Sequence, residues 1–177
     1  MSELVDGGMI PPHLSSEFFI WLWYSSEEGS GSILFGEEGS EESIQYWIED
    51  KISFRNPDAH KMRAVVLGEN ASNSLEARAA LASGKVVNEL QLHLRYDERD
   101  YSLRLSGPLL DMSAVKFPPH GVDEDDALLF ERMYHYEELW QCLSHLYRHF
   151  AALRSGSAWP ESILPGIRAW VGVSDSA

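Results

Sequence analysis

The residues most suggestive of catalysis are the Glu-x-Lys triplet Glu49, Asp50 and Lys51, with Asp58 a short distance downstream. Metal-dependent nucleases hold Mg²⁺ with such carboxylates and place the lysine near the attacked phosphate. In the common type, however, a further aspartate precedes the triplet, whereas Asp58 follows it. Because a three-residue match also arises often by chance, we predict no catalytic residues and place a nuclease behind two non-enzymatic functions.

Two histidines offer a second kind of chemistry. His145 and His149 are four residues apart in a helical pattern, which is a spacing that lets two imidazoles bind one metal ion. Spacing fixes no third ligand, and the acids at 123–126 are explained by their place at a helix start, where carboxylates stabilise the helix dipole. The single cysteine, Cys142, has no basic flank to activate it. We therefore predict no metal site and no cofactor.

Cations recur at alternate positions of segments that have strand periodicity. Apolar residues alternate over 44–54 and on both sides of the turn "DERD" (97–100), a pattern typical of half-buried strands in which the intervening residues face the other way. The cationic and histidine side chains assigned to that opposite face are Lys51, Arg55, Arg63, His93, Arg95 and Arg104. Glu49 is the one acid expected on the same face. Such a face is suited to a phosphate backbone, although a merely solvated sheet face has the same pattern.

Predicted helices and strands alternate along the chain, and together they must position this face. A helix is predicted around Phe18–Tyr24 with Ser15 or Ser16 as its cap, and a small helix from Asn73 or Ser74 to Gly84. A long helix follows Pro118-Pro119 and ends before Gly156, and a short one covers roughly 161–171. We predict a single α+β domain over residues 1–177: a largely antiparallel sheet packed on one face by the long C-terminal helix and shorter helices.

The net charge of −14 is unevenly distributed along the chain. Residues 1–50 contain eleven Asp or Glu and no Lys or Arg, whereas residues 51–177 contain seventeen acids and fourteen bases. The Ser, Glu and Gly content of 25–43 predicts a flexible acidic loop with one short strand at Ile33–Phe35. An acidic front of this kind suits a protein-interaction subunit that mimics or repels nucleic acid.

Two apolar segments are candidates for an interface as well as for the core. The seven residues from Phe18 to Tyr24 are far too few to cross a membrane, so protein must bury them. Burial in the domain's own core is one interpretation, and a subunit interface through Phe18, Trp21, Trp23 and Tyr24 is the other. In the long helix an apolar seam recurs at spacings of four and three and allows the same two interpretations. Its members are Leu129, Met133, Tyr136, Trp140, Leu143, Tyr147 and Phe150.

The tract "EARAALASGKVVNELQLHLRYDERDYSLRL", with "LLFERMYHYEELWQCLSHLY" and the opening "LSSEFFIWLWYSSE", resembles the C-terminal half of the recombination-associated protein RdgC family. The matching features are a small helix ending in Ala-Ser-Gly-Lys-Val-Val (82–87), an alternating hairpin and a long helix with an acidic start. RdgC proteins form ring-shaped dimers that bind DNA, chiefly duplex, with little sequence preference. The resemblance implies that the sheet cations contact DNA and that the chain forms a homodimer.

These observations give two competing functions. The first is an RdgC-like, non-sequence-specific DNA-binding protein linked to recombination or replication, with DNA and a second subunit as partners. The second is a non-catalytic subunit of a hetero-complex that docks through the aromatic helix. The single cysteine and the lack of an apolar leader or spanning segment favour a cytoplasmic location without membrane contact.

Overall fold

The computed structural model describes residues 12–36, 41–55, 63–67, 75–119, 121 and 125–172. Its helices are α1 (Pro12–Glu27), α2 (Leu75–Ala82), α3 (Asp125–Ser155) and α4 (Leu164–Val171), with a π-helical turn, η1 (Trp159–Ile163), before the last. The strands are β1 (Ser32–Phe35), β2 (Glu42–Arg55), β3 (Arg63–Leu67), β4 (Val86–Tyr96), β5 (Arg99–Ser106) and β6 (Asp111–Lys116). All pairings are antiparallel, in the order β1-β2-β4-β5-β6 with β3 on β2. The predicted α+β fold is confirmed.

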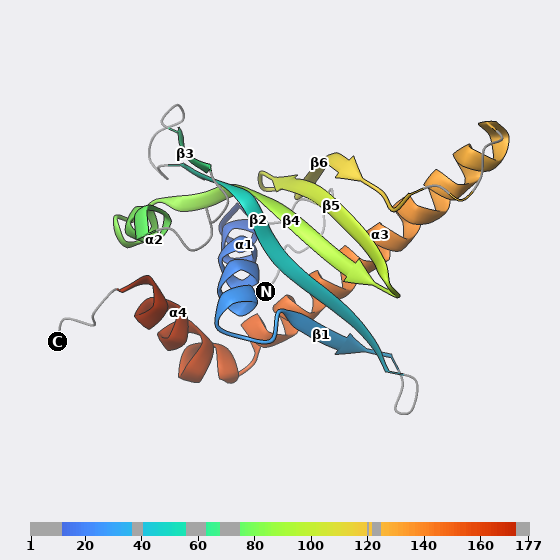
Figure 1. Ribbon diagram of the computed structural model, residues 1–177. Helices are drawn as coiled ribbons and strands as arrows, with labels where there is room; N and C mark the ends of the chain where they lie inside the picture. Colours follow the sequence, from blue (N-terminus) through green and yellow to red (C-terminus); the bar gives the residue numbers. More distant parts are fainter. Residues whose placement is uncertain are drawn as a thin grey trace.

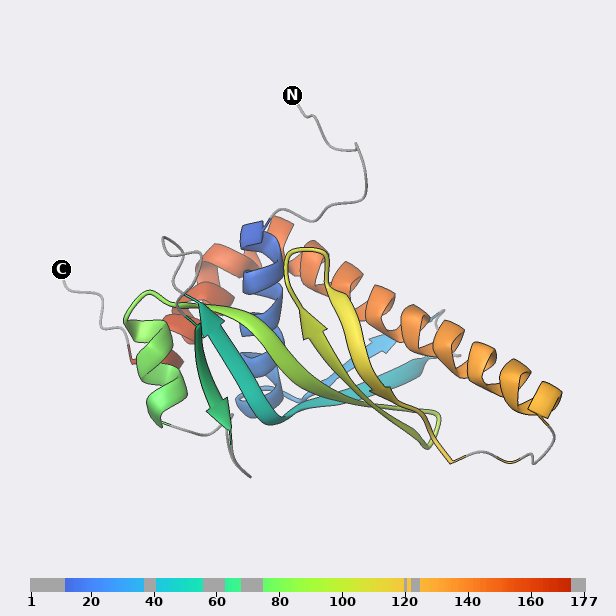
Figure 2. The same ribbon diagram turned by 90° about the horizontal axis from the view of Figure 1, so that it is seen from above.

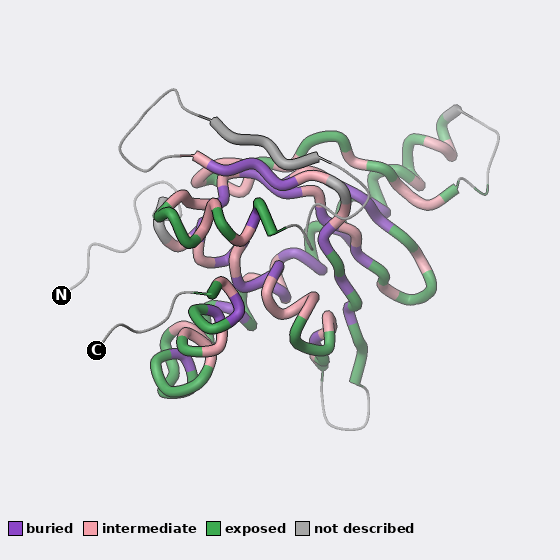
Figure 3. The backbone as a smooth tube through the Cα atoms, turned by 60° about the vertical axis from the view of Figure 1, so that its left-hand side comes forward, coloured by how far each residue is buried: buried purple, intermediate pink, exposed green. Residues whose placement is uncertain are grey.

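Helices α1, α3 and α4 lie together on one side of the sheet, whereas α2 lies at one end (Figures 1 and 2). The strand residues that alternate toward these helices are fully buried, as in Leu90, Leu92 and Leu94 of β4. Figure 3 shows the buried segments gathered in the central strands. No helix among the described residues covers the opposite side of the central strands, which we call the open face.

The β4–β5 hairpin is the element that sequence predicts best. Its two-residue turn places Asp97 at φ 47° and Glu98 at φ 60°, the left-handed geometry that matches strand twist. The facing strands then pair without interruption from Tyr96↔Arg99 to Glu89↔Ser106. By contrast, β6 was not predicted, and β2 contains a bulge between Ile48 and Ile52. The bulge explains why the alternation of β2 fails at Asp50.

The aromatic helix α1 supplies the centre of the core, so its interpretation as a subunit interface is wrong for three of the four residues. Phe18, Trp21 and Trp23 are 1%, 4% and 0% exposed. Phe18 packs on Phe150, and Trp23 meets Trp170 edge to face at 4.7 Å. Tyr24 is half-buried on α4. A helix that is apolar on all sides is satisfied here because it lies between the sheet, α3 and α4.

The start of α1 also differs from the prediction. The helix begins at Pro12, so Ser15 and Ser16 lie inside it and are not its caps. Both serines are buried. The short strand predicted at Ile33–Phe35 is present as β1, but the predicted loop over 25–43 also includes the end of α1 and the first residues of β2. Residues 37–40 lie outside the described part of the chain.

Two acids of the first fifty residues, Glu17 and Glu27, link helices through hydrogen bonds and ion pairs. Glu27 accepts hydrogen bonds from Trp23 Nε1 (2.7 Å) and Trp170 Nε1 (3.0 Å) and pairs with Arg78 at 3.0 Å. It thereby links α1, α4 and α2. Glu17 pairs with Arg154 of α3 at 2.6 Å. These carboxylates are therefore neutralised by bases from later in the chain, and they do not form a separate acidic surface.

Candidate nucleic-acid interface

The open face of the sheet carries the predicted polar residues in regular rows. One row runs across four strands as Trp47, His93, Ser102 and Lys116, and the next contains Gln45, Arg95 and Asp100. A third pairs Gln91 with Arg104. Of the six predicted contact residues, strand register places His93, Arg95 and Arg104 in these rows. Lys51 is joined to Arg104 through Glu89, whereas Arg55 lies apart from them, opposite Val86 at the end of β2. The sixth, Arg63, lies opposite Arg55 in β3, and its side chain is outside the described residues.

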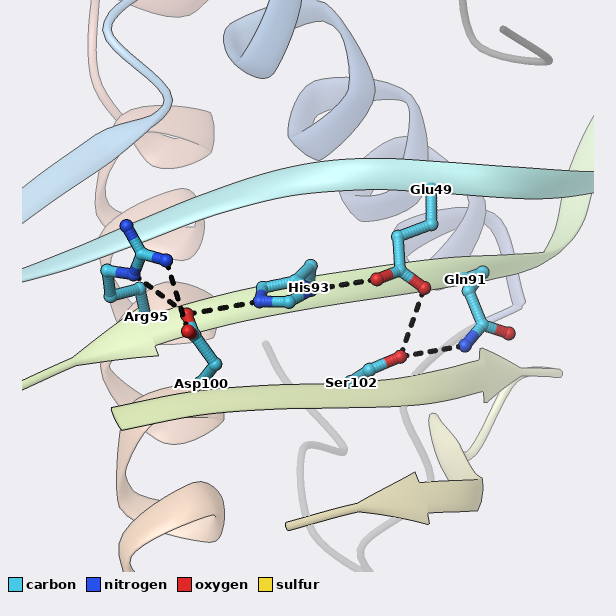
Figure 4. Close-up of polar contacts among 6 residues, drawn as sticks. All are labelled: Glu49, Gln91, His93, Arg95, Asp100 and Ser102. Carbon is cyan, nitrogen blue, oxygen red and sulfur yellow. Dashed lines mark hydrogen bonds and ion pairs between the residues drawn. The ribbon is translucent and has the colours of Figure 1, made fainter. Parts of the chain in front are cut away.

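His93 is the centre of a hydrogen-bonded network on this face (Figure 4). Its Nδ1 lies 2.7 Å from Glu49 Oε1, and its Nε2 lies 3.2 Å from Asp100 Oδ1. Ser102 donates a hydrogen bond to Glu49 Oε2 at 3.0 Å, and Gln91 donates one to Ser102 at 2.9 Å. Three strands are therefore connected by side chains that satisfy one another.

Arg95 and Asp100 form the most clearly defined ion pair of the face. Arg95 Nε and Nη2 lie 2.7 and 3.0 Å from the two carboxylate oxygens, which is the bidentate geometry that favours arginine over lysine. The hydrogen bond from Arg95 lowers the pKa of Asp100 below its ordinary value, and His93 acts in the same direction. The same bond raises the pKa of Arg95. About half of each side chain is nevertheless exposed.

A second cluster surrounds Glu89. Lys51 Nζ lies 2.8 Å from Glu89 Oε1, and Arg104 Nε lies 3.6 Å from the same oxygen. Glu89 is nearly buried, whereas the two cations remain partly exposed. A bulge in β4 between Val87 and Glu89 turns this carboxylate to the open face. Glu89 therefore forms ion pairs with two basic side chains.

These contacts correct the charge predicted for the face. Sequence reasoning counted Glu49 as its single acid, but Glu89 and Asp100 lie there too. The three carboxylates match the three cations Lys51, Arg95 and Arg104 in number, and every one of those cations lies within 4 Å of an acid. The paired part of the face is therefore balanced in charge and not basic.

An aromatic stack is exposed beside the network. Trp47 lies flat on the His93 ring, with centroids 4.0 Å apart and planes 13° apart, and is 37% exposed. The Arg95 guanidinium lies 5.7 Å from the Trp47 ring centroid. An exposed tryptophan beside an arginine is a combination that the unpaired bases of a single strand can stack against.

The other chemistries do not assemble in the described part of the chain. Glu49 and Lys51 are engaged with His93 and Glu89, and Asp58 lies outside that part. His145 stacks on Phe35 at 4.1 Å, whereas His149 contacts Trp21, and no group of three metal-binding side chains occurs among the described residues. Burial, then the nearby Glu138, raises the pKa of Cys142 to about 12, which makes it a poor nucleophile.

A second surface was only half predicted. In the apolar seam of α3, Leu143 and Phe150 are buried, but the four residues before them are exposed. The side chains that hold α3 to the sheet and to α1 instead include Leu139, Cys142 and Leu146. We call the exposed group the α3 stripe: Leu129, Phe130, Met133, Tyr136 and Trp140, each 48–69% exposed.

The chain matches no protein-family model, no curated protein and no solved structure. Within the described residues, no helix is both long enough and apolar enough to cross a bilayer.

Proposed function

We propose that this protein is an RdgC-like, non-catalytic DNA-binding protein that contacts duplex DNA without sequence preference through the open face of its sheet. The observation that supports the proposal best is that Lys51, Arg95 and Arg104 gather on one face of the sheet, which no helix among the described residues covers. The sequence resemblance to the C-terminal half of the RdgC family agrees with it. Recombination or replication is the process that this resemblance suggests.

The ion pairs define how such binding would work. A phosphate must replace Asp100 at Arg95, or Glu89 at Lys51 and Arg104, so each contact exchanges one anion for another. The Arg95 pair is half exposed, and exposed pairs are worth about 0–1 kcal/mol, so the exchange costs little. The carboxylates, however, remain close to the DNA and repel it. The proposed binding is therefore weak and strongly dependent on salt.

Fluorescence anisotropy with a labelled duplex, titrated at several salt concentrations, tests this function. Arg95→Gln with Arg104→Gln should weaken binding about tenfold or more and flatten the logarithmic salt dependence by about two phosphate contacts. Asp100→Asn should have the opposite effect, because it removes a competing anion and leaves Arg95 available. Arg132→Gln, which removes an exposed arginine of α3, is the matched control.

Two results would contradict the proposal. One is the absence of binding at low salt, and the other is an equal loss of affinity in the Arg132→Gln control. Added Mg²⁺ or Mn²⁺ should leave the labelled duplex intact. Cleavage that is lost in Glu49→Ala would instead support the nuclease.

A second candidate function is a protein-interaction subunit. The α3 stripe favours it, because five large apolar side chains on one helix are exposed there. The acidic front gives it less support than sequence predicted, because Glu17 and Glu27 are paired with Arg154 and Arg78. Nor is α1 its docking element, because the aromatic residues of α1 fill the core. In this function the α3 stripe is the docking surface.

A further inference from the structure

The α3 stripe lies on the part of α3 that extends furthest from the other helices. The N-terminal half of α3 projects away from α1 and α4 (Figures 1 and 2). Leu129, Met133, Tyr136 and Trp140 follow one another at spacings of four, three and four, so they share one side of the helix. Burying large apolar side chains is favourable by about 1.5–3 kcal/mol each, so a row of them in water indicates a partner.

The same side of α3 leads into an apolar hollow. Beyond Trp140, a pocket of about 270 Å³ opens between the C-terminal half of α3 and the β5–β6 turn. Its wall on α3 is formed by Trp140, Leu143, Ser144, Tyr147 and Arg148, and Leu109 and Leu110 of the turn form the opposite wall. One continuous surface of this chain therefore combines a projecting apolar half-helix with a hollow that can receive apolar side chains.

We infer that the α3 stripe is a homotypic interface, in which α3 packs antiparallel against α3 of a second copy of this chain. Two-fold symmetry requires that a surface be complementary to itself. When Met133 is placed against the partner's Trp140 in an antiparallel pair, Leu129 comes to the level of the partner's Ser144. The projecting half of each helix then enters the hollow of the other copy.

One charge pair favours the same register, which also brings Glu137 to the level of Glu137 of the partner subunit. In that pairing Asp126, near the start of α3, lies within one residue of the level of Arg148 of the partner subunit. Both side chains are exposed, and both lie on the same flank of the apolar side chains. Two-fold symmetry makes this acid–base contact twice. A parallel pair would instead bring Asp126 beside the partner's Asp126 and Arg148 beside the partner's Arg148.

The area is sufficient for an association of this kind. Five side chains that are about half to two-thirds exposed offer roughly 500 Å² per copy, or about 1,000 Å² for two, which is the lower limit for a specific interface. Leu109 and Tyr147 at the hollow add to this area. We therefore expect a reversible dimer whose formation depends on protein concentration. The inference assigns the α3 stripe to a second copy of this chain, in place of a hetero-complex partner, and the stripe shares no residue with the proposed DNA contacts.

Sedimentation equilibrium of the full chain over a range of concentrations, without DNA, tests the inference. The wild-type protein should show a monomer–dimer equilibrium. Met133→Glu with Trp140→Glu should weaken it about 100-fold or more, because both side chains are central to the interface. Leu75→Glu is the matched control, since it places the same charge on another exposed apolar residue, 85% exposed in α2. Circular dichroism should show the same helix content in all three proteins.

A charge exchange tests the antiparallel register separately. Asp126→Arg and Arg148→Asp should each weaken the dimer by placing like charges side by side, and the double variant should restore it. A monomer at every concentration, or a dimer that Met133→Glu with Trp140→Glu leaves intact, would overturn the inference. So would a double variant no better than the worse single one. Anisotropy with the labelled duplex on the same variants reports on DNA binding independently, so failure of either proposal is distinguishable.

Discussion

The open face of the sheet and the α3 stripe differ in how their side chains are satisfied. On the sheet, Glu89 pairs with Lys51 and Arg104, Asp100 pairs with Arg95, and His93 joins Asp100 to Glu49. On α3, large apolar side chains stand in water beside a hollow that none of them fills. The paired side chains of the sheet face satisfy one another without a partner, so DNA would bind them only by displacing a carboxylate from its cation. The α3 stripe leaves large apolar side chains exposed, and it indicates a partner because association would bury them.

This difference assigns distinct physical signatures to the two surfaces. Binding at the sheet face should depend on salt, because one anion replaces another at each arginine. Association through α3 should depend on apolar area, with a smaller contribution from Asp126 and Arg148. The two proposals are compatible, since the α3 stripe and the open face of the sheet share no residue.

The largest effect on stability is expected on the buried side of α3, where it contrasts with the effect on the exposed side. Leu139 is fully buried, whereas its neighbour Trp140 is 57% exposed. Leu139→Ala should therefore lower the free energy of unfolding by about 2–5 kcal/mol, and Trp140→Ala by less than about 1 kcal/mol in the monomer. Urea denaturation at low protein concentration measures both. Equal losses would mean that Trp140 belongs to the core and that the α3 stripe is not a separate surface.

An intermediate effect is expected at Glu89 on the sheet face. Glu89→Ala removes the acid that Lys51 and Arg104 share, so we expect a loss of about 1–3 kcal/mol in the free energy of unfolding. The same change should strengthen binding to the labelled duplex. A Glu89→Ala variant that is less stable and also binds DNA more weakly would contradict this expectation. It would show that Glu89 contributes to DNA binding by holding Lys51 and Arg104 in place, and that this effect exceeds its repulsion of phosphate.

Much of this arrangement is predictable from the sequence, and the exceptions have physical reasons. Alternation predicts the β4–β5 hairpin and the face on which Arg95 and Arg104 lie. It does not identify Glu89, because the β4 bulge at Asn88 changes the parity of the strand. Nor does it identify Asp100, because the polar run "DERD" predicts a turn through residue 100, whereas β5 begins at Arg99.

The α3 stripe shows another limit. A period of 3.6 residues cannot say which of two adjacent apolar sides of a helix meets the sheet. The predicted seam followed Leu129 to Phe150, and only its last part, with Leu143 and Phe150, is buried. The side that packs through Leu139 and Cys142 was missed because His135 and Glu138 interrupt it. These two are buried with Tyr101, whose hydroxyl hydrogen-bonds to both.

The smallest expected effect is the pH dependence of the Arg95–Asp100 pair. Because the pKa of Asp100 is lower in the folded chain than in the unfolded one, the pair contributes stability above the unfolded value of about 3.9. That contribution is lost as the pH falls through the folded value. The stability difference between wild type and Asp100→Asn should therefore not shrink between pH 7 and about pH 4, and it should shrink below that pH.

Urea denaturation at a series of pH values measures this difference, with Asp97→Asn as the matched control in the same hairpin. A difference that already shrinks between pH 7 and pH 5 would be inconsistent with a lowered pKa. It would mean that Arg95 does not hold the carboxylate in solution.

The most direct test of the proposed function is a map of the DNA contact by nuclear magnetic resonance. Duplex DNA should be titrated at low salt into the isotope-labelled full chain, with amide and arginine side-chain signals followed. We predict that the perturbed signals cluster at Trp47, His93, Arg95 and Arg104 and disappear as salt is raised. Perturbations confined to α3, or none at any salt concentration, would contradict a DNA-binding role for the sheet face.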